Sequence, residues 1–150
     1  MKERKKHVFL SLVIVLFLTL NTNAKSSLPD SSRYSIIKEH SSQLYFSPTD
    51  KELETLFEQI SAFVKASKRK SNRGKRLKMK DYLFQVIPEV DKKGQRIITV
   101  HGMCHYGREG YDGWRENVIY IEDGGACFFI STYNISENGK FSLDYGCKSP

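Results

Sequence analysis

Residues 49–66, TDKELETLFEQISAFVKA, are the most strongly patterned stretch of the chain outside its N-terminus. Thr49 and Glu52 have the spacing of a capping box, which marks the start of a helix. Apolar residues then recur at three- and four-residue steps, which places them on one face of a helix: Leu53, Leu56, Phe57, Ile60, Phe63 and Val64. The stretch predicts an amphipathic helix whose apolar face packs against a core.

After residue 80 the apolar pattern changes to the two-residue period of β-strands. We expect strands over 82–90, 96–106, 117–122, 127–135 and 140–145, separated by glycine-containing turns and loops, and a short strand over 43–46. Pro88 predicts an edge position or a bulge in its strand. The order predicts an α+β domain in which one main helix packs on an antiparallel meander of four to five strands, similar to the cystatin arrangement.

The first 24 residues have the layout of a secretory signal peptide. Four bases and one acid lie in residues 1–7, the apolar run VFLSLVIVLFLTL follows, and small Ala24 ends the segment. Thirteen helical residues span about 20 Å, which is less than a hydrocarbon core of about 30 Å. We therefore expect a signal-peptide helix cleaved near Ala24, a flexible leader over 25–42 and a single domain over 43–150. This predicts a soluble product in the periplasm or outside the cell.

The formal net charge of +7 is distributed unevenly. Residues 1–24 contribute +3, and residues 65–80 carry nine bases and no acid. The basic tract could make a weak contact with an anionic membrane or a glycan. It has no interleaved aromatic residues for base stacking, so nucleic acid is not an expected partner and a solvated, flexible loop is favoured. The candidate contacts are Lys65, Lys68, Arg69, Lys70, Arg73, Lys75 and Arg76.

Three cysteines, Cys104, Cys127 and Cys147, would meet an oxidising compartment after export, which favours a disulfide. In a simple meander Cys104 and Cys127 are two strands apart, whereas the Asn138-Gly139 hairpin brings Cys127 near Cys147. Geometry thus favours Cys127–Cys147, unless the loop after residue 106 reorders the strands.

Histidines near these cysteines could form two kinds of site, a thiol nucleophile with its base and a metal site. The turn before Cys127 could present a nucleophile, with His101 or His105 as its base. No helix begins after Cys127 to lower its pKa, so a turn with a structural cysteine is favoured. His101 and His105 would lie about 13 Å apart on a strand, too far for one metal ion, and are expected to be partly exposed. No cofactor or metal site is predicted.

Four segments resemble small bacterial exported proteins that carry a D-G-G-x-C-[FY]-F motif. They are Tyr45–Thr49, Asp91–Gly94, Gly102–Cys104 and, most distinctively, Asp123–Phe129 (DGGACFF). The resemblance covers roughly residues 45–146 and implies a single exported domain without implying an activity. It also implies a Cys104–Cys127 pair, because these two cysteines lie in its motifs.

The glycine-rich loop over 107–116 is the best candidate contact surface in the chain. Its Trp114 could bind a partner or equally fold back on the core. We expect a non-enzymatic binding or inhibitory module, such as an immunity protein, whose partner is another exported protein. The alternatives are a small thiol-dependent hydrolase using Cys127 and envelope association through the basic tract. The candidate binding residues are Tyr111, Trp114, Arg115 and Asp123.

Overall fold

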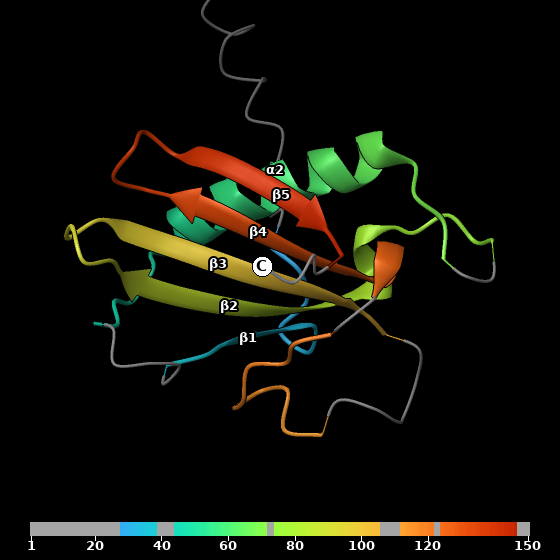
Figure 1. Ribbon diagram of the computed structural model, residues 1–150, viewed down its shortest axis with the longest axis horizontal. Helices are drawn as coiled ribbons and strands as arrows, with labels where there is room; N and C mark the ends of the chain where they lie inside the picture. Colours follow the sequence, from blue (N-terminus) through green and yellow to red (C-terminus); the bar gives the residue numbers. More distant parts are fainter. Residues whose placement is uncertain (1–27, 39–43, 72–73, 106–111, 122–123, 147–150) are drawn as a thin grey trace, which may run out of the picture.

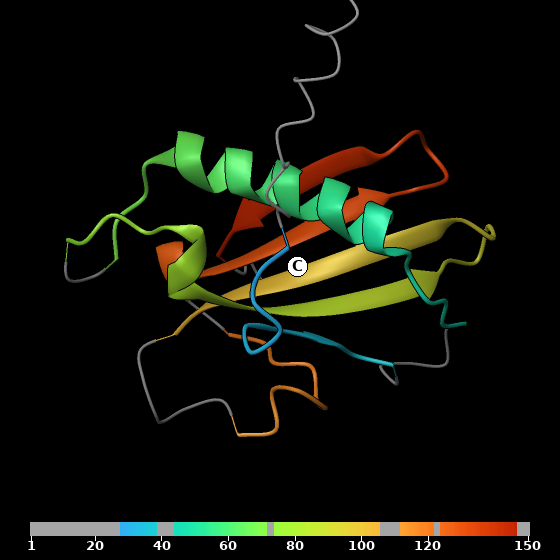
Figure 2. The same ribbon diagram turned by 180° about the vertical axis from the view of Figure 1, so that it is seen from behind.

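The computed structural model describes residues 28–38, 44–71, 74–105, 112–121 and 124–146, and the capping box at Thr49 starts the one α-helix of these ranges. Helix α2 (Asp50–Ser67) begins where the Glu52 N–H donates to Thr49 Oγ1 and the Thr49 N–H donates to Glu52 Oε2. The helix lies across one face of a five-stranded sheet (Figure 2). The predicted α+β class and the predicted helix are confirmed.

The sheet has the strand order β1-β2-β3-β4-β5 (Figure 1). Strands β2 to β5 form an antiparallel meander, as predicted, and β1 pairs with β2 in parallel. Their bounds are β1 (Tyr34–Ile36), β2 (Tyr82–Val90), β3 (Arg96–Cys104), β4 (Phe128–Asn134) and β5 (Lys140–Tyr145).

Strand β1 corrects the prediction of a flexible leader over 25–42. Residues 34–36 pair with 84–86 of β2, and the following Ile37 is buried. The segment is short and flanked by serines, so its own sequence has no strand pattern. It forms a strand because β2 supplies the hydrogen-bond partners for its backbone. The sheet therefore includes residues before the predicted domain start at 43. The predicted signal peptide, 25–27 and 39–43 lie outside the described residues.

The predicted strand at 43–46 is not formed by its described residues. Leu44 makes a single antiparallel bridge to Val90, and its side chain is exposed. Pro88 lies near this part of β2, beyond the segment that β1 covers, since β1 ends opposite Val86. An edge position or a bulge was predicted for Pro88. On the side of β2 that faces β1, Pro88 has no partner in β1, although β3 pairs with it on the other side.

The predicted strand over 117–122 is wrong in the part of it that the structure describes, residues 117–121. This segment runs irregularly across the sheet and uses side chains as hydrogen-bond partners instead of a neighbouring strand. Strands β3 and β4 are consequently adjacent, with Met103 opposite Phe128. This register brings Cys104 and Cys127 together.

The main core lies between α2 and the sheet. It includes the predicted apolar helix face except Phe63, which is 38% exposed, together with Tyr82, Phe84, Val100 and Phe129. Gly102 of β3 is paired with Phe129 of β4, and a Cβ at residue 102 would lie under 3.0 Å from three ring atoms of Phe129. The Phe129 ring thus packs in the space that a side chain at residue 102 would occupy.

We expect Gly102→Ala to lower the free energy of unfolding by about 2 kcal/mol, because the new methyl group overpacks a filled core. Thermal and urea unfolding would measure the loss. In a Phe129→Leu background the same substitution should cost less, since the smaller side chain leaves room. An equal cost in both backgrounds would contradict the proposed clash.

Candidate functional site

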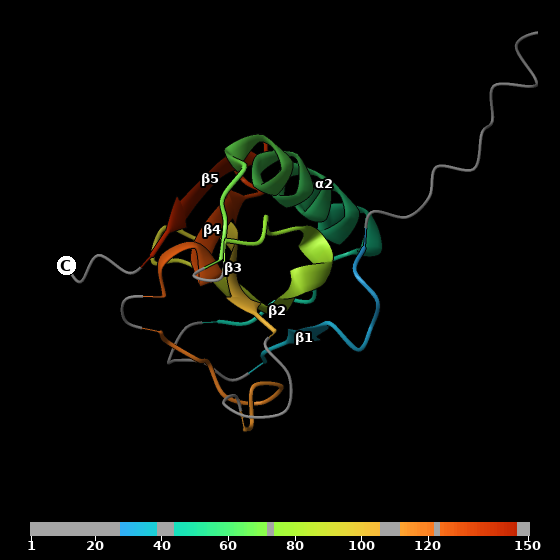
Figure 3. The same cartoon turned by 90° about the vertical axis from the view of Figure 1, so that its right-hand side faces the viewer.

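Segment 112–121 covers one end of the sheet face opposite α2 (Figure 3). The buried residues Leu83, Met103 and Phe128 form a second, smaller core on that face. The side chains packed against it are Trp114, Ile119, Ile121 and Ile130. The segment is therefore a folded layer, although most of it has no regular secondary structure.

Gln85 of β2 binds this segment with its whole amide group. The side chain is 0% exposed. Its Nε2 donates to the carbonyl oxygen of Trp114 and to that of Asn117 (2.6 Å), and its Oε1 accepts from the Ile119 N–H (2.8 Å). One buried side chain thus supplies the partners that a β-strand would have supplied to this backbone.

His101 of β3 holds the same segment from the next strand. Its Nδ1 lies 3.0 Å from the carbonyl oxygen of Ile119, and its ring packs edge-on against Tyr120 and Phe128. The expected partial exposure of His101 is wrong, because the segment crosses over this face and leaves it 3% exposed. His105, just beyond the strand, is exposed. His101 therefore anchors segment 112–121 to the sheet.

Arg115 ties the segment to β1. Its guanidinium lies 4.5 Å from the centre of the Trp114 ring and donates to the carbonyl oxygens of Ser32 (2.8 Å) and Tyr34 (3.5 Å). The hydroxyl of Ser35 donates to the Arg115 carbonyl oxygen (2.8 Å). Trp114 itself is half-buried against the smaller core. Trp114 was expected either to bind a partner or to fold back on the core, and in the structure it packs against the smaller core.

Tyr120 is a surface aromatic that the sequence reasoning missed. Its side chain is 62% exposed, and its ring makes an edge-on contact with His101. The signal was present in the run NVIYIE, where Ile119 and Ile121 pack inward and Tyr120 lies between them. Two predicted contact residues, Tyr111 and Asp123, lie outside the described residues.

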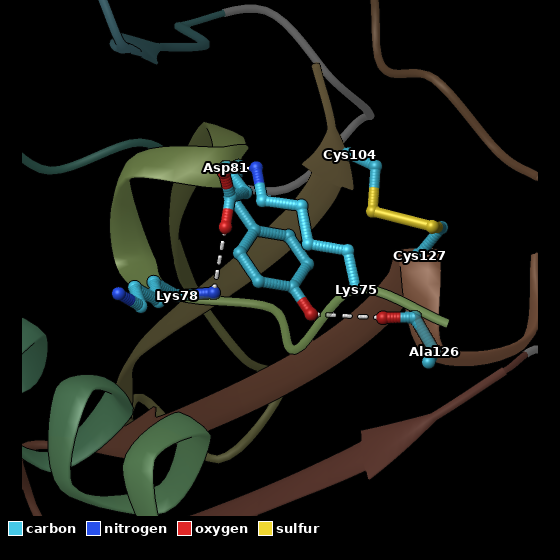
Figure 4. The surroundings of a disulfide bond; sticks show 7 residues. Lys75, Lys78, Asp81, Cys104, Ala126 and Cys127 are labelled. Carbon is cyan, nitrogen blue, oxygen red and sulfur yellow. Dashed lines mark hydrogen bonds and ion pairs between the residues drawn. A yellow bond between two sulfur atoms is a disulfide. The ribbon is translucent and has the colours of Figure 1, made fainter. Parts of the chain in front are cut away.

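The disulfide joins Cys104, at the end of β3, to Cys127, just before β4 (Figure 4). Their Cα atoms are 4.8 Å apart. The hydroxyl of Tyr82 donates to the Ala126 carbonyl oxygen (2.8 Å) and fixes the adjoining 3₁₀ turn Gly125–Cys127 (η2). With its Sγ in this bond, Cys127 has no thiolate. Cys147, the other candidate, lies outside the described residues.

The described part of the basic tract is more ordered than the expected flexible loop. Arg69 stacks 4.2 Å above the Tyr145 ring, and Lys70 and Arg76 form a β-bridge. Lys75 Nζ lies 3.1 Å from Asp81 Oδ1. Lys68 is exposed and ends α2 in the left-handed conformation. Arg73 lies outside the described residues.

Asp81 is the acidic residue next to the basic tract. Burial alone would raise the pKa of Asp81, but the hydrogen bond from the Lys78 N–H and the ammonium of Lys75 hold it below its ordinary value. The carboxylate therefore stays ionised and fixes the 3₁₀ turn Met79–Asp81 (η1) at the end of the tract.

No three His, Cys, Asp or Glu side chains in the described ranges are grouped so that they could hold a metal ion. No helix in the same ranges is long and apolar enough to cross a membrane.

Comparison of the chain with protein-family models, with curated proteins and with solved structures finds no match. The function is therefore argued from the site itself.

Proposed function

We propose that this protein is an exported, non-enzymatic module that binds another protein through the outer surface of segment 112–121. The order of charged, apolar and small residues in 1–24 supports export. The observation that carries the binding proposal is the hydrogen bonding of buried Gln85 to three backbone groups of the segment. An irregular segment held this firmly on a sheet is preorganised, which lowers the entropy cost of binding.

Tyr120 is the central contact in this proposal. Tyrosine is enriched among the residues that contribute most to binding energy, because it offers a large rigid surface and a hydroxyl group. Tyr120 stands out from the segment while its ring is braced by buried His101. The ring therefore has little freedom to lose when a partner covers it.

We expect a photo-crosslinking residue at position 120 to capture one exported protein in the native compartment. The same group at Glu58, an exposed position on α2, should not capture that protein. The captured protein, once purified, should bind the unmodified chain directly. Equal capture from both positions, or no direct binding, would count against the proposal. Inhibition of the partner's toxic activity would support an immunity role.

In that purified pair, Tyr120→Ala should weaken binding by about thirtyfold, which corresponds to the loss of a central aromatic contact. The free energy of unfolding of the variant should fall by only about 1 kcal/mol, from the lost edge-on contact with His101. Tyr45→Ala is the matched control, since Tyr45 is also exposed but follows Leu44 at the Val90 end of β2. A Tyr120 variant that binds as tightly as the Tyr45 variant would refute the assignment.

A further inference from the structure

A cleft of about 320 Å³ lies between the C-terminal half of α2 and the segment that leads into η1. Figure 2 shows η1 below this half of the helix. Ser61, Val64 and Lys65 line the cleft from α2, and residues 76–79 line it from the other side. The volume is at the lower end of the range for small-molecule sites, which is about 300–1,000 Å³.

The floor of the cleft is apolar. Val64 and Leu77 belong to the main core, and Met79 is half-buried against the same core. These side chains form an apolar strip where the helix and the basic tract meet. Such a strip can accept a hydrocarbon chain without burying a polar group.

The rim of the cleft is cationic. Lys65, Arg76 and Lys78 line it, and no acidic residue is among the described residues that do so. Arg76 is fixed in place because its Nη2 donates to the Lys65 carbonyl oxygen (2.8 Å). Asp81, the nearest acid in the chain, is already bonded to Lys75 and to the Lys78 N–H. The ammonium groups of Lys65 and Lys78 make no hydrogen bond or ion pair among the described residues.

A second cleft of about 210 Å³ adjoins the first, since Ser61 and Met79 line both. Leu28 and Pro29 extend the apolar surface, and Arg33 and Lys80 add positive charge. The one acid there, Asp30, accepts a hydrogen bond from the Ser32 N–H (2.8 Å), and its pKa is lowered first by its hydrogen bonds with Ser32. The two clefts therefore meet at Met79 and Ser61, with apolar side chains on both sides of this point and cations in the lining of each.

We propose that this pair of clefts binds a single-chain amphiphile with an anionic headgroup, of the fatty-acid class. The hydrocarbon chain lies along Val64, Leu77 and Met79, and the headgroup meets Lys65, Arg76 and Lys78. Binding requires both halves of the ligand. The apolar floor interacts with the hydrocarbon chain but not with a charged group, and the cationic rim interacts with the anionic headgroup. A flat membrane surface would meet the lysines but could not reach the recessed floor.

The test uses decanoate, below its micelle-forming concentration, with the purified protein. Calorimetry should show saturable binding, and chemical shifts of the Met79 methyl group should move. Decyltrimethylammonium has the same chain with the opposite charge and should not bind. Inorganic phosphate has the charge without a chain and should not compete. Equal binding of the cationic amphiphile, or full competition by phosphate, would overturn the proposal, as would no binding of decanoate.

Two matched variants place the site. Lys65→Gln with Lys78→Gln removes two rim charges and should raise the Kd for decanoate about fivefold. Lys68→Gln with Lys70→Gln removes the same charge from exposed positions that do not line the clefts and should leave the Kd unchanged. Equal loss in both variants would indicate a general charge effect and overturn the site. Binding to anionic vesicles without binding of monomeric decanoate would overturn it in favour of a membrane surface.

Discussion

Replacement of both Cys104 and Cys127 by alanine is expected to lower the free energy of unfolding by about 3 kcal/mol. The bond closes a loop with a sequence separation of 23, and that loop contains the irregular segment 112–121. Without the bond, the unfolded chain gains conformational freedom and the segment loses one of its anchored ends. For a domain of this size the melting temperature should fall by about 10 °C, measured by calorimetry.

Reductant provides the control for this prediction. It should lower the melting temperature of the unmodified protein and have no effect on the double variant. Mapping of unreduced peptides should recover Cys104 joined to Cys127, with Cys147 open to alkylation. A Cys127–Cys147 peptide, or a melting temperature that does not respond to reductant, would show that the bond does not form in solution.

Gln85→Leu is expected to lower the free energy of unfolding by about 3 kcal/mol, because three backbone groups in partly buried hydrogen bonds lose their partner at once. These are the carbonyl oxygens of Trp114 and Asn117 and the N–H of Ile119. Leucine is similar in size but can neither donate nor accept. Urea unfolding would measure the loss, and the fluorescence of Trp114, the single tryptophan, should shift to longer wavelength as segment 112–121 loosens.

Gln95→Leu is the matched control for that substitution. The Gln95 amide also donates one hydrogen bond, to Glu137, and accepts one, from Asn134, but the residue is half-buried near the surface. Water can replace its partners, so we expect a loss below about 1 kcal/mol and no change in tryptophan fluorescence. If Gln85→Leu were as mild as Gln95→Leu, segment 112–121 would not depend on the buried amide. The binding proposal would then lose its main support.

Local pattern was sufficient for the helix and for most of the sheet. The capping box and the apolar stripe after Thr49 depend on residues close together in the chain, so they predict the helix without knowledge of what packs against it. In the four antiparallel strands every second residue faces the helix, which produces the two-residue apolar period. The short strand β1 was missed because three residues carry too little pattern, and its partner β2 lies about 50 residues later.

The candidate site was only partly predictable. The loop with Trp114 and Arg115 was identified from its composition, but its attachment to the sheet depends on Gln85 and His101. Neither residue shows in the sequence that it will be buried under a distant loop. Tyr120 was assigned to a strand over 117–122 and was not singled out, although its place between inward-packing Ile119 and Ile121 predicts an exposed side chain.

The cysteines show most clearly which features are local and which are not. The sequence by itself predicted a disulfide, from the expected export, and determined that the helix would pack on a meander of strands. Which cysteines meet was decided only in three dimensions. Side chains of Gln85 and His101 take the hydrogen bonds of residues 117–121, so no strand forms there and β4 pairs directly with β3. That pairing places Cys104 beside Cys127, because strand order depends on contacts between residues far apart in the chain.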